Sequence, residues 1–199
     1  MKKQILTLAI AGLIIATFSS CKDEPTLNND ASVIRATNIV EIVGGSLKNV
    51  AIVKAEHFAF TGKRWTTLAE TPFKNNGFVL NLPEILPEEF LTPNYFGDFR
   101  SFETTAFNAY DRNGRRIGWF FYEAQAQSGN LYLKTWIYSD TDVAKTEWRP
   151  AYNKGWNTVY FAVQQGWQNG GEWPSPRRLL DKSQLPRNLT FNWYFWSFD

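Results

Sequence analysis

The chain has 199 residues and carries 21 lysines and arginines against 19 acidic residues, with one histidine and one cysteine. This composition excludes a disulfide-stabilised scaffold and a zinc site built from several cysteines or histidines, so we expect stability to come from an apolar core. If residues 1–20 are removed, two lysines go with them and 19 residues of each sign remain. Such a chain lacks the net positive charge that attracts proteins to nucleic acid, and we expect no nucleic-acid partner.

The first 20 residues have the three-part layout of a secretory signal peptide. Lys2 and Lys3 precede an uncharged apolar run from Ile5 to Phe18, which is followed by Ser19 and Ser20. The run has roughly 14 residues, whereas a membrane-spanning helix needs about 20. We therefore predict a cleaved signal over residues 1–20.

Cys21 directly follows this segment. The sequence Phe18-Ser19-Ser20-Cys21 resembles the end of a bacterial lipoprotein signal. The resemblance implies cleavage before Cys21, a diacylglyceryl thioether on its sulfur and a third acyl chain on the new amine. Each buried methylene contributes about 0.8 kcal/mol and two chains suffice for stable attachment, so we expect the membrane to be a partner through this anchor.

Residues 21–35 form the lipidated cysteine and a polar tether, which would span roughly 20 Å if it is flexible. Its first residues, Lys22-Asp23-Glu24, resemble the export signal of Bacteroidetes surface lipoproteins. That resemblance implies a location on the outer membrane, facing the cell exterior. No later stretch of the sequence is long and apolar enough to span a membrane.

Residues 36–199 are expected to form a single all-β domain. Aromatic residues make up 17% of the chain, and they favour strands together with Val, Ile and Thr. Runs of these residues between Gly, Asn and Pro predict about nine strands. The expected ranges are Ala36–Val43, Val50–Phe60, Arg64–Leu68, Gly77–Leu82, Ser101–Tyr110, Ile117–Gln125, Leu131–Ser139, Asn157–Val163 and Leu189–Phe198.

Two turn signals predict how some of these strands pair. Asn113-Gly114 is typical of a type I′ turn, so the runs on either side should form a hairpin. Gln127–Asn130 should reverse the chain again and extend the hairpin to a three-strand meander, while Pro83–Leu91 should contain a short helical turn. We predict an antiparallel β-sandwich, with an antiparallel β-barrel as the alternative.

The run Leu131–Ser139 alternates in a way that allows two interpretations. Strand periodicity places Tyr132, Lys134, Trp136 and Tyr138 on one face. In one interpretation the strand is buried on both faces and Lys134 extends its ammonium to solvent. In the other, the four side chains form an exposed aromatic strip that contacts a partner. The last strand is aromatic on both faces, which predicts a central or covered position.

A Gly-rich stretch, Gly166–Pro174, is the sequence's best candidate for a glycan site. Indole rings stack on the C–H faces of sugars, and we predict stacking platforms at Trp167, Trp173 and Trp136. By analogy with stacked bases, each could contribute about 1–3 kcal/mol. The expected partners for sugar hydroxyls are Gln168, Asn169 and Glu172. The alternative is that Trp167 and Trp173 only cover the edge of a sheet.

Catalytic and metal-binding patterns are sparse. His57 lies within an expected strand and is interpreted as structural. Asp140 and Asp142 are too few for a calcium loop, so no metal or other cofactor is expected. A glycosidase needs two carboxyls beside a cleft, and the available ones are Glu103, Glu123, Glu147 and Glu172, but no spacing selects a pair.

Several segments resemble parts of small Bacteroidetes surface lipoproteins that share no catalytic motif. They are Asn75–Pro83, Phe90-Leu91, Lys154–Tyr160 and the aromatic end Leu189–Phe198. The resemblance implies a β-sandwich-like domain that works beside glycan-capture or adhesion systems. The leading hypothesis is a non-catalytic glycan-binding protein on the cell surface. The alternatives are a structural or adhesion subunit that contacts another surface protein and, third, an unrecognised hydrolase.

Overall fold

The computed structural model describes residues 31–42, 46–59, 64–93, 98–104, 106–163 and 179–198. The expected signal peptide, Cys21 and most of the expected tether lie outside the described residues, as does the whole of Gly166–Pro174. In the described part, the regular elements are β-strands and short 3₁₀ turns, and the predicted all-β class is confirmed. None of the helices found there has the length and apolar character required to cross a membrane.

The strands, in chain order, are β1 (Val33–Ala36), β2 (Val40–Ile42), β3 (Ile52–Ala59), β4 (Arg64–Pro72), β5 (Phe78–Asn81), β6 (Thr92–Pro93), β7 (Arg100–Thr104), β8 (Ala106–Tyr110), β9 (Arg116–Gln125), β10 (Leu131–Ser139), β11 (Gly155–Val163), β12 (Leu179–Leu180) and β13 (Asn192–Ser197). The 3₁₀ turns are η1 (Leu47–Asn49), η2 (Glu88–Phe90) and η4 (Lys182–Gln184).

One large, curled sheet of 11 strands dominates the described structure. Strands β9 and β10 pair near their shared turn, from Gln125 opposite Leu131 to Glu123 opposite Leu133. Beyond those residues the two strands take other partners: β9 pairs with β8, and β10 pairs with β7. The sheet therefore has a β9 half, containing β4, β3, β8, β9, β13 and β2, and a β10 half, containing β12, β11, β10, β7 and β6.

The segment that precedes β9 in the chain was expected to be one strand, Ser101–Tyr110, and this prediction is wrong in one respect. The segment forms two strands, β7 and β8, which pair with different halves of the sheet. Both are antiparallel to their neighbours, so the antiparallel prediction holds for them. Splitting the segment lets the two halves diverge, and the sheet curls around a concave face.

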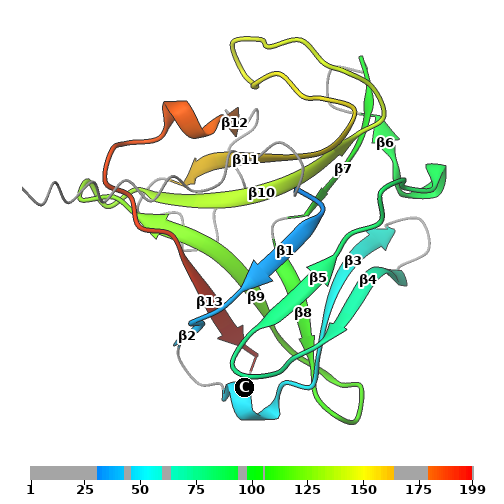
Figure 1. Cartoon of the computed structure of the whole chain (residues 1–199), viewed down its shortest axis with the longest axis vertical. Coiled ribbons are helices and arrows are strands. Elements are labelled where there is room, and N and C mark those ends of the chain that lie inside the picture. The colour runs from blue at the N-terminus through cyan, green and yellow to red at the C-terminus, as the bar shows by residue number, and fades with distance from the viewer. Residues whose placement is uncertain are drawn as a thin grey trace, which may run out of the picture.

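A second sheet of two strands, β1 and β5, packs on that concave face (Figure 1). Ile34 of β1 and Phe78 and Leu80 of β5 point into the core, while Arg35, Val79 and Asn81, which alternate with them, are exposed. They meet Phe107 and Phe120, which are fully buried in the large sheet. Two sheets that face each other around an aromatic core give the sandwich-like or barrel-like arrangement that the sequence predicts.

The first and last predicted strands differ from the observed ones in their bounds. The last, predicted over Leu189–Phe198, spans only Asn192–Ser197. The predicted strand Ala36–Val43 is two strands, β1 and β2, and β1 begins at Val33, inside the range expected to be tether. The last strand is β13, which pairs antiparallel with β9 and parallel with β2. Its predicted central position is confirmed. The expected helical turn at Pro83–Leu91 is only η2.

The hairpin between β8 and β9 is confirmed, but its turn type is not. Only Gly114 has a positive φ, +76°, whereas a type I′ turn would also require one at Asn113. Instead, the Asp111 carboxylate accepts hydrogen bonds from the backbone N–H groups of Asn113 and Arg115, both at 2.9 Å. The turn with two positive φ angles is Asn75-Asn76, which joins β4 to β5.

Gly118 of β9 is a point where the neighbouring strand comes unusually close. A Cβ at this position would overlap the backbone carbonyl oxygen of Trp196 and the ring of Phe195. We predict that Gly118→Ala lowers the free energy of unfolding by about 3 kcal/mol, because strand β13 must shift. Gly114→Ala is the comparison: its Cβ would meet open space, and the positive φ alone should cost about 1 kcal/mol. Chemical denaturation measures the free energy of unfolding of both variants. Equal losses would contradict a close contact between Gly118 and β13.

Candidate functional site

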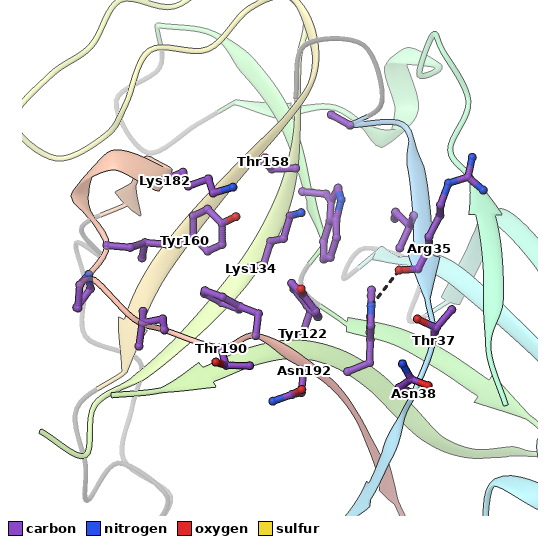
Figure 2. Close-up of a pocket in the computed structure, with 18 of the residues that line it drawn as sticks. Arg35, Thr37, Asn38, Tyr122, Lys134, Thr158, Tyr160, Lys182, Thr190 and Asn192 are labelled. Atoms are coloured by element: carbon purple, nitrogen blue, oxygen red, sulfur yellow. Dashed lines mark hydrogen bonds between the residues drawn. The ribbon is translucent and has the colours of Figure 1, made fainter. Parts of the chain in front are cut away.

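A pocket of about 1280 Å³ opens on the concave face of the large sheet, beside strand β1. Its walls come from β9, β10, β11, β13, β1 and the segment that follows β12 (Figure 2). The pocket lies where β9 and β10 separate, since Tyr122 and Lys134 are the first inward-facing residues beyond their shared pairs. A volume of this size can hold a ligand as large as an oligosaccharide unit.

The floor of the pocket is a row of aromatic rings in contact. Trp136 stacks on Trp193, with ring centroids 5.9 Å apart, and Trp193 contacts Tyr122 at 5.1 Å. Tyr122 in turn stacks on Phe191 at 5.3 Å, and Phe191 contacts Tyr160 at 5.2 Å. Trp136, Trp193 and Tyr160 are buried, whereas Tyr122 and Phe191 are half-buried and retain accessible ring surface.

Strand pairing brings these rings together from distant parts of the chain. In β9 and β13, Tyr122 is opposite Trp193, and both side chains point to the concave face. The indole Nε1 of Trp193 donates a hydrogen bond of 3.0 Å to the backbone carbonyl of Arg35, drawn as a dashed line in Figure 2. This bond ties β1 to β13 and fixes one side of the pocket.

Lys134 lies over the aromatic floor. Its ammonium is 5.2 Å from the centroid of the Trp136 ring and 5.7 Å from that of Tyr122. These are distances at which a cation is attracted to an aromatic face. Because Lys134 and Tyr160 are opposite each other in β10 and β11, the phenol lies next to the lysine.

The third wall is the segment that crosses from β12, at one edge of the β10 half, to β13 in the β9 half. It starts with η4, whose N-cap is Asp181. The Asp181 carboxylate accepts from the backbone N–H of Ser183, and the Gln184 side chain accepts from the backbone N–H of Asp181. This capping box fixes the turn that carries Lys182.

The described lining carries positive charge and no negative charge. Its basic residues are Arg35, Lys134, Lys182 and Arg187, and no Asp or Glu lines the pocket in the described part of the chain. In Figure 2 the ammonium ends of Lys134 and Lys182 point into the same part of the pocket as the Tyr160 hydroxyl, while the Arg35 guanidinium turns away. Hydroxyl and amide side chains also line the pocket: Thr37, Asn38, Thr158, Ser183, Asn188, Thr190 and Asn192. Apart from the aromatic floor, the rest of the lining is aliphatic: Ala31, Val33, Ile34, Leu185, Pro186 and Leu189.

The predicted glycan-site residues have different outcomes. Trp167, Trp173, Gln168, Asn169 and Glu172 lie outside the described residues. Trp136 is 3% exposed and packs in the main core, so it does not present a ring on an open surface. Its accessible part lines the pocket.

The interpretation of β10 as an exposed aromatic strip is therefore wrong. Tyr132, Trp136 and Tyr138 are all buried, and Ile137 on the opposite face is buried too. The other interpretation, a strand covered on both faces, is confirmed. The physical reason is that Trp136 packs on one face in the main core, which includes residues of β1 and β5, while Ile137 packs on the other face with Val143 and Tyr152.

Exposed aromatics gather instead on the convex face of the β9 half. We call Trp65, Trp119, Trp196 and Phe198 the outer aromatic patch; each exposes between 37% and 51% of its surface. Trp119 is opposite Trp196 in the β9–β13 pair and contacts the Phe198 ring at 5.2 Å. The guanidinium of Arg116 lies between Trp65 and Phe198, 4.9 and 5.1 Å from their centroids.

The catalytic candidates do not converge on the pocket. His57 packs against Phe90 and Phe102, with centroids 6.1 and 5.5 Å away, as expected of a structural histidine. Glu103, Glu123 and Glu147 are absent from the pocket lining. Asp140 is bonded to the Arg100 side chain at 2.9 Å. Within the described ranges, no group of three or more His, Cys, Asp or Glu side chains could hold a metal ion.

Comparison with known proteins adds no further assignment. No protein family matches this chain, and neither a curated protein nor a solved structure is significantly similar to it. The fold and the pocket define an all-β protein with a cationic, aromatic-lined pocket.

Sequence reasoning missed most of the pocket. Tyr122, Tyr160, Phe191 and Trp193 fall within expected strands and Lys182 falls within none, and no local motif groups the five residues. The one signal was Lys134, a charged residue in an otherwise aromatic strand face. A lysine held between aromatic rings could have indicated a pocket.

Glu123 follows Tyr122 on β9, and its side chain alternates to the other face of the strand. Burial raises the pKa of the Glu123 carboxyl. A carboxyl with a raised pKa binds protons more readily in the folded chain, so the free energy of unfolding falls as the pH rises through its titration range. We predict that Glu123→Gln raises Tm at pH 7.5 and has little effect at about pH 4 and below.

Thermal unfolding followed by circular dichroism at both pH values measures this effect. Glu147→Gln, at an exposed loop carboxylate, is the matched control and should leave Tm unchanged at either pH. A lower Tm for Glu123→Gln at pH 7.5 would show that the carboxylate stabilises the fold.

Proposed function

We propose that this protein is a non-catalytic glycan-binding protein and that its ligand occupies the pocket between the two halves of the large sheet. The observation that supports this most strongly is the combination of an aromatic floor with hydroxyl and amide walls. A sugar has apolar C–H faces and a rim of hydroxyl groups, so both kinds of surface would be matched.

The accessible rings determine where a sugar would stack. Tyr122 and Phe191 keep ring surface open to the pocket, and Trp193 supports Tyr122 from beneath. Thr190 and Asn192, on either side of Phe191, both line the pocket and can bond to the hydroxyl rim. In this proposal Trp136 supports the floor from the core.

The charge of the lining favours binding over hydrolysis. Glycoside hydrolysis ordinarily uses two carboxyl groups that flank the scissile bond. The described lining contributes lysines and arginines, and none of its side chains is a carboxylate. A pocket of this composition would hold a sugar without cleaving it.

The N-terminal sequence supports a location for this binding. A signal that ends at Cys21 and the Lys22-Asp23-Glu24 that follows it resemble those of Bacteroidetes surface lipoproteins. We propose that acyl chains on Cys21 hold the protein on the outer membrane, facing the exterior, where it captures glycan from the surroundings.

A second function, contact with a neighbouring surface protein, is favoured by the outer aromatic patch. Exposed aromatic side chains that contact one another mark interaction surfaces more often than isolated ones do. Arginine and tryptophan are also enriched at protein interfaces, and Arg116 lies between two rings of this patch. This surface faces away from the pocket, so the two functions are compatible.

A glycan array probed with the purified full chain in detergent tests the leading proposal. We predict that Phe191→Ala weakens binding to the strongest array ligand by about tenfold, because a stacking surface is lost. Phe198→Ala removes an equally large ring from the outer aromatic patch and should bind as the parent does. Trp173→Ala tests the Gly166–Pro174 stretch in the same assay. Unchanged binding by Phe191→Ala, with loss in either of the other two variants, would move the site out of the pocket.

The anchor has its own test. Cys21→Ala removes the acylated sulfur, and we expect the variant to leave the membrane fraction, because no acyl chain remains to be buried. Cell fractionation and immunoblotting measure this, with Ser20→Ala as a control that keeps the thiol. Retention of Cys21→Ala on membranes would contradict lipidation at this residue.

A further inference from the structure

We infer that the ligand of the pocket is an acidic glycan, a sugar that carries a carboxylate or sulfate group, and that Lys134 and Lys182 bind this group. The inference rests on the proposed function, since it specifies the class of glycan that the pocket takes. The net charge of the chain does not indicate an acidic ligand, because the residues after position 20 carry 19 positive and 19 negative side chains.

Local charge differs from this overall balance. Among the described lining residues, three side chains, those of Lys134, Lys182 and Arg187, bring positive charge to the pocket, and no carboxylate lines it. The Arg35 side chain turns away and contributes through its backbone (Figure 2). Charges of one sign in a concave site concentrate ligands of the opposite sign, because the low-dielectric walls focus the field.

The two lysines approach from opposite walls. Lys134 comes from β10 and Lys182 from η4, and their ammonium ends point into the same part of the pocket as the Tyr160 hydroxyl (Figure 2). Tyr160 and Lys134 are strand partners, and η4 is fixed by its capping box. Two ammonium groups and a phenol can donate hydrogen bonds to a single anionic group held between them.

The position of Lys134 indicates where the acidic group and the sugar ring of such a ligand would lie. Its ammonium lies above the rings of Tyr122 and Trp136, while Phe191 lies on the other side of Tyr122. A sugar ring stacked on Tyr122 and Phe191 would therefore direct a substituent toward Lys134. That arrangement fits a pyranose with an acidic group better than it fits a neutral pyranose.

The lining also distinguishes an acidic sugar from a fatty acid. An acyl chain favours aliphatic walls, and Val33, Ile34, Leu185, Pro186 and Leu189 supply some. Hydroxyl and amide side chains line the pocket as well, among them Thr158, Ser183 and Asn188. These groups would lose hydrogen bonds to water against an acyl chain, whereas sugar hydroxyls replace those bonds.

The test uses pairs of glycans that differ only in one acidic group: uronate oligosaccharides with their neutral methyl esters, and sulfated galactan oligosaccharides with their unsulfated forms. We expect the full chain to bind the acidic member about tenfold more tightly in at least one pair, with affinity that falls as salt is added. Binding that favours neutral members, or that ignores the acidic group, overturns the inference and leaves the proposed function standing. No binding to any glycan, or tighter binding of palmitate, overturns both.

Charge variants then assign the group to the lysines. Lys182 lies on an exposed turn. Lys182→Gln should weaken binding of the acidic glycan by about five- to tenfold and leave binding of the neutral glycan of the same pair unchanged. Lys134→Met keeps the length of the side chain and should have the same selective effect. Lys74→Gln makes the same charge change at the exposed β4–β5 turn and should bind as the parent does. Equal losses for acidic and neutral ligands in both pocket variants would mean that the lysines do not bind the acidic group.

Discussion

The separation of β9 from β10 is the constraint on which the rest of the structure depends. The two strands share only three residue pairs beside their turn before β7 and β8 enter between them. Inserting two strands into a hairpin forces its arms apart and curls the sheet. The concave face that results is too wide for one layer of side chains, and β1 and β5 fill only part of it. The pocket is the part that remains open.

The same aromatic residues therefore serve the core and the site. Trp136 and Trp193 stack on each other inside the main core, and both line the pocket. Phe107 contacts both of them from the other side, at 5.2 and 5.9 Å. A floor that is continuous with the core is rigid, because its rings cannot move without disturbing packing. A rigid floor would lower the entropy lost when the proposed ligand binds.

The charge of the pocket lining differs from the net charge of the chain. The chain without its first 20 residues is balanced, yet the described pocket lining is cationic and the outer aromatic patch surrounds a single arginine. Ion pairs elsewhere, such as Lys54 with Glu70 at 3.0 Å and Arg100 with Asp140 at 2.9 Å, account for part of the acidic complement. No described residue of the pocket lining is a carboxylate, so lysines and arginines supply the formal charges of that lining.

The sequence by itself determined the all-β class, the ranges of β9, β10 and β11 to within two residues, and the hairpin that joins β8 to β9, because alternation and turn residues act over a few neighbours. The predicted three-strand meander is wrong, because β8 and β10 pair with the same edge of β9 and β13 takes the other edge. The sequence also predicted the central position of β13. Only the tertiary structure decided that Ser101–Tyr110 divides into two strands, that Trp136 is buried, and that Tyr122, Phe191, Tyr160 and Lys182 meet. The physical reason is that these outcomes depend on which strands pair across the curled sheet. Pairing between residues far apart in the chain leaves no periodic trace in any single segment.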